Sequence, residues 1–242
     1  MMRISVAPEV VAQFPEMSLG IVYGTIQSAR PGYPETIAEL RSSALERLNA
    51  MGLESVLAAP SLQAWRQAYE KFGMKAKKYP PTHEALARRL LKSQAWPNIN
   101  PVVDIYLSNQ ARHLLPHGGY DVTTLAGDLL LDVSPGGEPF EPLGGGSEST
   151  DPGEVVYRDA ERVLTRRWNY RDCDKAKITP DTRQFLLMIE SPDTTVPVSQ
   201  VSAACEDLAE RYRKCFEGAF EWTAQEMAHS PGFDLPPFAP SS

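Results

Sequence analysis

"INPVVDIYLSNQARHLLPHGGYD" runs from Ile99 to Asp121 and changes character halfway along. Its first part is apolar at helical spacing and predicts a helix from about Pro101, a favoured first-turn residue, to Leu115. Pro116 stops such a helix because its nitrogen has no hydrogen to donate. The two glycines that follow let the backbone approach another group closely, since they carry no side chain. The stretch therefore predicts a helix that delivers a tight turn to the mouth of a pocket.

Helices and strands are both predicted on either side of this stretch. Apolar spacing predicts helices over 33–52, 61–73 and 82–93, and strands over 19–26, 129–133, 154–159, 162–170 and 183–191. A long helix is predicted over 197–228, and residues 233–242 read as a flexible tail. Because no regular strand–helix alternation is present, we expect a single α+β domain over 1–232, with a mixed β-sheet core and flanking helices.

The composition is that of an ordinary globular protein of 242 residues with a net charge of −7. No signal-peptide pattern and no long apolar run is present, so we expect a cytoplasmic protein without a membrane contact. Three cysteines without metal-ligand spacing predict no disulfide framework, and we expect neither a metal nor a cofactor. Basic residues nevertheless concentrate in 75–92 and 158–183, which leaves room for contact with a polyanion.

Three segments carry a resemblance to one family. The 99–121 stretch resembles phenylalanyl-tRNA synthetase beta chains, in which Ile-Asn-x-Val-Val-Asp leads without a gap to Pro-x-His-Ala-Phe-Asp. "GEVVYRDAERVLTRRWNYRDCDKAKI" (153–178) resembles the downstream strand pair of the same editing domain, which the third and fourth B modules form. "WRQAYEKFGMKAKKYPPTHEALARRLL" (65–91) resembles the leader of free-standing versions. The likeness covers about 60–190 and implies an editing-domain fold that hydrolyses mischarged aminoacyl-tRNA in trans.

The sequence departs from the family pattern at two places. The histidine stands at His117, one place early, and Gly118 occupies the aligned site. The family's side-chain-reading glutamate aligns with Cys173, which Asp172 and Asp174 flank. The resemblance therefore does not extend to tyrosine specificity. A carboxylate in the pocket suits a guanidinium-like group, because it accepts two parallel N–H bonds.

Hydrolysis of an aminoacyl ester needs a positioned water and donors for the developing oxyanion. We assign the backbone of Gly118 and Gly119 to the oxyanion or to close approach of the substrate. Asn109 and Asp121 are candidates to orient the water or the terminal ribose, and His117 is a candidate proton relay. The ester beside a free ribose hydroxyl is already labile, so positioning alone can suffice.

Two further sets of residues are expected to bind the amino acid and the tRNA. A continuous strand would send the side chains of Arg166, Trp168, Tyr170 and Asp172 to one face, which we expect to line the pocket. The substrate-binding set is Asp172, Asp174, Trp168, Tyr170 and Tyr120. The tRNA-binding set is Arg166, Arg167, Arg171, Lys75, Lys77, Lys78, Arg88 and Arg89.

Other interpretations remain open at this point. Trp168 is as compatible with a core position as with a ligand platform, and Asp121 and Asp172 can cap turns or pair with arginine. The same fold also serves a non-catalytic module that binds tRNA or an amino acid, or a hydrolase or transferase that acts on a small molecule.

Overall fold

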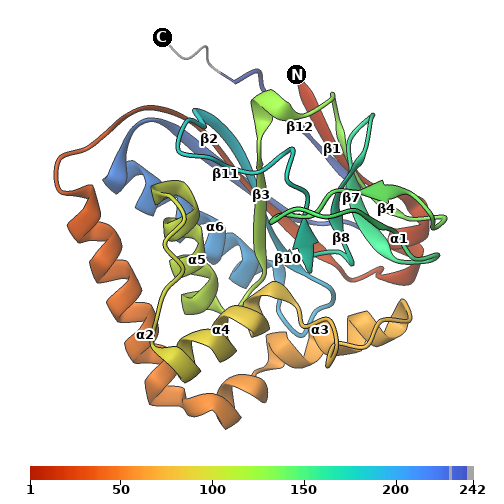
Figure 1. Cartoon of the computed structure of the whole chain (residues 1–242), viewed down its shortest axis with the longest axis horizontal. Coiled ribbons are helices and arrows are strands. Elements are labelled where there is room, and N and C mark those ends of the chain that lie inside the picture. The colour runs from red at the N-terminus through yellow and green to blue at the C-terminus, as the bar shows by residue number, and fades with distance from the viewer. Residues whose placement is uncertain (229–230, 239–242) are drawn as a thin grey trace.

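The structure is a computed structural model that describes residues 1–228 and 231–238. At its centre lies a four-stranded antiparallel sheet, counted over these residues, in the order β11-β2-β10-β3. Its strands are β2 (Ser18–Ala29), β3 (His117–Asp121), β10 (Gln184–Ser191) and β11 (Phe216–Glu226). Figure 1 shows helices gathered on one side of this sheet and a second sheet on the other.

The second sheet has six strands within the described residues, in the order β12-β1-β4-β7-β8-β9. They are β1 (Met2–Val6), β4 (Leu129–Val133), β7 (Val155–Arg158), β8 (Val163–Arg166), β9 (Arg171–Asp172) and β12 (Gly232–Leu235). The sheet is mixed because β1 and β4 run parallel while the other neighbours are antiparallel. A separate short ribbon pairs β5 (Pro139–Phe140) with β6 (Glu148–Ser149).

The helices cover the remaining surfaces of the central sheet and of its neighbour. They are α1 (Pro8–Gln13), α2 (Tyr33–Leu57), α3 (Pro60–Lys71), α4 (Thr82–Ser93), α5 (Pro101–His113) and α6 (Val198–Cys215), with a 3-10 turn η1 (Val122–Thr124) after β3. In α5, the side chain of Asn100 accepts a hydrogen bond from the backbone N–H of Val103 and caps the helix start. None of the helices in the described residues is long and apolar enough to cross a membrane.

The strand β10 organises two hydrophobic cores because its side chains alternate between its faces. Leu186 and Met188 belong to the core between the two sheets. Leu187 and Ile189 belong to the core between the central sheet and α6. The expected α+β architecture, with a mixed β-sheet and flanking helices, is confirmed.

The C-terminal prediction was wrong in two respects. The helix predicted over 197–228 ends at Cys215, and the chain continues as β11, paired along its length with β2. Phe216 and Phe220 are four residues apart and so share one face in a helix or in a strand, which made the two indistinguishable by spacing. The expected tail at 233–242 also begins as structure, because β12 pairs with β1 and buries Phe233 and Leu235. Residues 239–242 lie outside the described part.

Two turns lie elsewhere than predicted. The helix α5 ends at Leu114 in a left-handed conformation, and His117–Asp121 is strand β3 rather than a turn. The strand predicted through 162–170 instead turns at Arg167 and Trp168, both of which have positive φ, before β9 returns beside β8. The simple alternation that placed Arg166, Trp168 and Asp172 on one face is therefore wrong.

Candidate functional site

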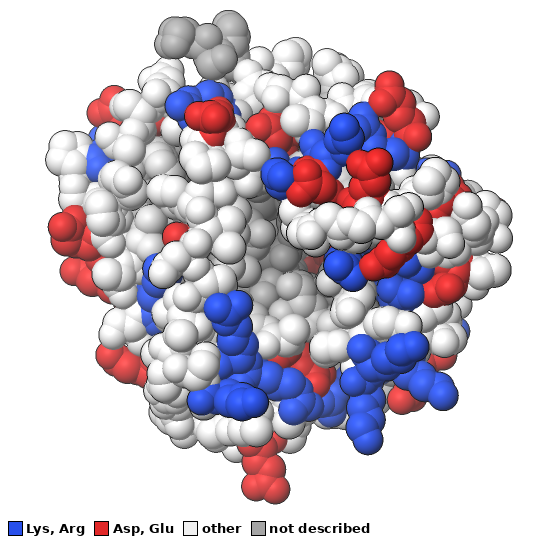
Figure 2. All heavy atoms as spheres, viewed as in Figure 1, with Lys and Arg blue, Asp and Glu red and all other residues white. Residues whose placement is uncertain are grey.

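A pocket lies between the two sheets, where β3 and β10 face β7, β8 and β9. Figure 2 shows a hollow over β3 and β10, seen in the same view as Figure 1. This inter-sheet pocket is lined by Thr82, His117, Gly118, Tyr120, Tyr157, Thr165, Trp168, Asn169, Tyr170, Asp172, Met188 and Glu190. Its cavity volume is about 30 Å³.

Strand register explains why one of the two glycines opens onto the pocket. Gly118 pairs with Met188, which also lines the pocket, and a Cβ built on Gly118 would have nothing within 4 Å. A Cβ on Gly119 would lie 2.2 Å from Cδ2 of Leu187. Gly118 therefore leaves open space beside the backbone, whereas a side chain at Gly119 would collide with β10.

Glu190 forms the buried wall of the pocket. Its carboxylate oxygen Oε1 accepts hydrogen bonds from the Tyr157 hydroxyl at 2.5 Å and from the Trp168 indole at 2.7 Å. Oε2 accepts only a long bond of 3.4 Å from the amide of Asn169. Glu190 is 2% exposed, and this burial raises its pKa to about 7.

Asp172 is the second carboxyl group of the pocket. Its Oδ1 accepts a hydrogen bond of 2.6 Å from the Thr165 hydroxyl. Since that hydroxyl has one hydrogen, the Tyr120 hydroxyl, 2.5 Å away, donates to Thr165 in turn. Asp172 is half-buried, and its partial removal from solvent raises its pKa to about 6. Asp172 and Tyr120 thus lie together in the pocket, as the sequence predicted.

The raised pKa of Glu190 makes folding stability depend on pH. The folded chain holds a proton on Glu190 up to about pH 7, whereas the unfolded chain releases it near 4.5. Stability from this group is therefore present below pH 4.5 and is lost as pH rises to about 7, by on the order of 3 kcal/mol. We expect urea denaturation of the wild type to show a larger loss of stability between pH 5 and 8 than Glu190→Gln shows. Parallel pH profiles of the two proteins would contradict this assignment.

His117 is held as a neutral, fully bonded ring. Its Nδ1–H donates to the carbonyl of Leu115 at 2.9 Å, so Nε2 accepts from the Asn109 amide at 3.1 Å. Burial lowers its pKa to about 3. Asn109 also donates to the carbonyl of Ala204 at 2.8 Å and does not line the pocket. The expected proton relay through His117 and the water-orienting role of Asn109 are therefore corrected: both side chains join α5, β3 and α6.

The other two predicted aspartates are also occupied elsewhere. Asp121 accepts hydrogen bonds from the Thr123 backbone N–H and hydroxyl and from the Thr182 hydroxyl, which makes it the cap of η1. Asp174 forms a surface ion pair of 2.7 Å with Lys177. Neither lines the inter-sheet pocket, so their assigned roles in catalysis and substrate binding are not retained.

The two aromatic candidates have different positions. Trp168 is fully buried and packs edge-on against Phe14 and Trp65, each with ring centroids 4.8 Å away. Only its indole N–H reaches the pocket, through Glu190, so it is not a stacking platform. Tyr170 is half-buried, lines the pocket and contacts the ring of Tyr79. Tyr170 keeps its candidate role at the pocket wall.

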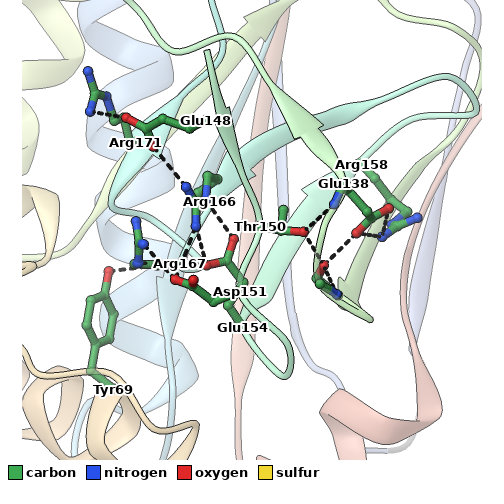
Figure 3. Close-up of polar contacts among 12 residues, drawn as sticks. Tyr69, Glu138, Glu148, Thr150, Asp151, Glu154, Arg158, Arg166, Arg167 and Arg171 are labelled. Atoms are coloured by element: carbon green, nitrogen blue, oxygen red, sulfur yellow. Dashed lines mark hydrogen bonds and ion pairs between the residues drawn. The ribbon is translucent and has the colours of Figure 1, made fainter. Parts of the chain in front are cut away.

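Arg166 and Arg167 are structural residues rather than tRNA contacts. Figure 3 shows both side chains among Glu148, Asp151 and Glu154. Arg166, which is 3% exposed, bonds Glu154 at 2.8 Å and Glu148 at 2.8 Å. Arg167 bonds Asp151 at 2.8 Å. The acidic partners come from a glycine-rich loop, residues 142–154 ("PLGGGSESTDPGE").

The remaining basic candidates are at the surface. Arg171 is partly exposed and pairs with Glu148 at 2.7 Å. The other basic candidates all lie in the α3–α4 segment and are exposed, and we call them the basic rim: Lys75, Lys77, Lys78, Arg88 and Arg89. Figure 2 shows basic side chains gathered below the hollow, over α3 and α4.

The basic rim borders a second cavity that adjoins the inter-sheet pocket. Lys75, Lys77, Pro80 and Glu84 line this second cavity, whereas Thr82 lines the inter-sheet pocket. Residues 80–84 therefore separate the two. Arg88 is held by Glu84 at 2.8 Å, while no described residue forms an ion pair with Lys75, Lys77 or Arg89.

Several pocket residues escaped sequence reasoning, namely Thr82, Tyr157, Thr165, Asn169, Met188 and Glu190. One signal in the sequence could have identified Glu190. It ends the apolar run "FLLMIE", so it is expected to be buried, and buried acids are unusual. In the described residues no cluster of three or more His, Cys, Asp or Glu side chains is suited to hold a metal ion.

Comparison with known proteins gives one family match and a similar solved structure. A family model described as the B3/4 domain matches residues 64–223, which extends beyond the expected likeness to include α6 and most of β11. A search of curated proteins finds no match. Among solved structures, an N-terminal fragment of the phenylalanyl-tRNA synthetase beta subunit from Pyrococcus horikoshii is similar, with a TM-score of 0.45 and 11% identity. The match covers 90% of this chain and 49% of that one, so the chain spans about half the fragment's length.

Proposed function

Because the chain belongs to the B3/4 domain family, we propose that it is a trans-editing hydrolase that deacylates mischarged aminoacyl-tRNA. The observation that carries the proposal is the inter-sheet pocket, in which the bare backbone of Gly118 faces a carboxyl pair. Gly118 admits the ester, and Asp172 and Thr165 supply polar groups that can hold a water molecule. This arrangement fits an activated ester, whose hydrolysis depends on positioning more than on a strong base.

The reaction needs no group beyond water and the ester. Water adds to the ester carbonyl carbon, and the bond between that carbon and the ribose oxygen breaks. One proton of the water passes to the ribose oxygen, the other is released to solvent, and the amino acid leaves as its carboxylate. Backbone N–H groups beside Gly118 are the proposed donors to the oxyanion.

The basic rim is the proposed contact for the tRNA acceptor end. Its Lys and Arg side chains neutralise phosphates, which position a nucleic acid without reading its sequence. Residues 80–84 lie between the rim and the pocket. The proposed path of the tRNA runs along the rim and past these residues, so that its end reaches Gly118 and Tyr170. Tyr170 offers a face for the terminal adenine.

Asp172 favours an amino acid with a guanidinium-like side chain, because a carboxylate accepts two parallel N–H bonds from it. The proposed substrate is canavanyl-tRNA(Arg), which carries an arginine mimic. Such a near-isostere escapes rejection by binding energy alone and calls for a separate editing step.

The direct test is release of labelled amino acid from a panel of mischarged tRNAs by the purified chain. We expect canavanyl-tRNA(Arg) to be deacylated well above the spontaneous rate, and correctly charged tRNAs to be spared. No turnover on any member of the panel would overturn the proposed function.

A second experiment, which measures tRNA binding, tests the role of the basic rim. We expect a triple Lys75→Ala, Lys77→Ala and Lys78→Ala variant to weaken tRNA binding and to reduce the slope of log affinity against log salt by about 2. Lys214→Ala, which removes an exposed lysine from α6, is the matched control and should bind tRNA as the wild type does. An unchanged salt slope would exclude the rim as the phosphate contact.

One observation favours a second candidate, a non-catalytic module that binds tRNA or an amino acid. His117, the only histidine lining the pocket in the described part of the chain, is neutral and has both ring nitrogens bonded. Tight binding of acylated tRNA with the ester intact over hours would select this candidate.

A further inference from the structure

In the part of the chain that the structure describes, the two acids of the inter-sheet pocket have no cation beside them, in contrast to the buried acids Glu84 and Glu154. Glu84 is paired with Arg66 at 2.8 Å, and Glu154 with Arg166 at 2.8 Å. Within the described residues, neither Asp172 nor Glu190 forms an ion pair, and no Lys or Arg lines the pocket. A buried carboxylate without a counter-charge is costly, so these acids either hold a proton or accept a positive charge from a ligand.

Each of the two acids also keeps one oxygen with spare hydrogen-bonding capacity. In Glu190, Tyr157 and Trp168 occupy Oε1, while Oε2 has only the 3.4 Å bond from Asn169. In Asp172, Thr165 occupies Oδ1 and no described residue bonds Oδ2. The fixed oxygens orient the carboxyl groups, and the free ones remain available to a ligand. Charged donors make shorter and stronger hydrogen bonds to such oxygens than neutral donors do.

We propose that Glu190, acting with Asp172, is the specificity-determining residue that selects a cationic amino-acid side chain in the inter-sheet pocket. The inference rests on the proposed function for its setting, since the amino acid is taken to arrive on tRNA. Asp172 lies beside the Gly118 opening, and Glu190 forms the buried wall. The cationic side chain of the bound amino acid supplies the positive charge that Asp172 and Glu190 do not receive from a Lys or Arg of the pocket. A neutral side chain of the same shape leaves both acids uncompensated.

The test compares two ligands that differ in charge and not in shape. Arginine and citrulline are each joined by an amide to the 3′ position of 3′-amino-3′-deoxyadenosine, so that neither analogue can be hydrolysed as an ester. We expect the wild type to bind the arginine analogue at least about tenfold more tightly than the citrulline analogue. We expect that preference to fall towards one in Glu190→Gln and in Asp172→Asn.

Glu190→Gln keeps an oxygen to accept from Tyr157 and Trp168 while removing the charge, so it separates charge reading from mere support of the fold. Glu190→Asp keeps the charge and should retain the preference. Glu138→Gln, at an acid paired with Arg158 outside the pocket, is the control and should match the wild type.

Equal binding of the two analogues by the wild type would overturn the inference, as would an undiminished preference in Glu190→Gln. If Glu190→Gln does not fold, Asp172→Asn and the wild-type ratio still decide the matter. Because the analogues are not turned over, the outcome is independent of deacylation. A charge preference without ester hydrolysis would sustain the inference and remove the proposed function, and hydrolysis without a charge preference would do the reverse.

Discussion

Replacing Arg166 by methionine is expected to lower the free energy of unfolding by about 3–5 kcal/mol. Arg166 lies between Glu154 and Glu148, and the side chain of Glu154 is 0% exposed. Methionine fills similar space but leaves Glu154 with only the longer contact of 3.7 Å from Arg167. A buried carboxylate that loses its main partner cannot be compensated by water, and this is the source of the large loss. Urea denaturation followed by circular dichroism measures it.

Arg171→Ala is the matched control for this experiment. Arg171 also pairs with Glu148, but its side chain is 38% exposed. Water can therefore solvate the Glu148 carboxylate when the pair is broken. We expect a loss of at most about 1 kcal/mol. A stable Arg166→Met protein that had lost tRNA binding would restore the nucleic-acid interpretation of Arg166.

Local signals were sufficient to predict α5, with its end within about two residues of the predicted Leu115. Pro101 and Pro116 bracket an apolar pattern of helical period, and both act on the backbone next to them. The end of α6 was not predictable in the same way. Phe216 and Phe220 satisfy both periods, and it is the long strand β2 that makes the segment a strand. That information comes from a segment nearly two hundred residues away.

The pocket was predictable only where resemblance and residue type agreed. Gly118, Tyr120, Tyr170 and Asp172 are all in its lining. The wrong predictions concern the charge partners of arginine. Arg166 was predicted to contact phosphate, but its partner in the structure is Glu154, from a loop that folds over it. Arginines that bind phosphate and arginines that neutralise buried acids have the same local sequence, so only tertiary structure separates them.

Gly118→Val is expected to abolish deacylation, with a rate loss of at least about 100-fold, while leaving the fold intact. A Cβ on Gly118 meets nothing within 4 Å, and this residue lies in a strand at ordinary φ, where a β-branched side chain is well accommodated. The methyl groups of valine would occupy the open space beside Gly118, which is the space that the ester must enter. Tm should therefore stay close to that of the wild type, and turnover of the best substrate in the panel measures the loss.

Gly119→Val provides the contrast because the two positions are adjacent and differ only in the face of β3 that they present. A Cβ on Gly119 would lie 2.4 Å from the carbonyl oxygen of Leu186, which belongs to the backbone of β10 and cannot rotate away. We expect this variant to unfold more readily, by about 1–3 kcal/mol. If Gly118→Val kept full activity, the substrate would have to enter by a route that does not pass over β3. The proposed oxyanion role of β3 would then be excluded, whereas the roles of Glu190 on β10 and Asp172 on β9 would keep their own test.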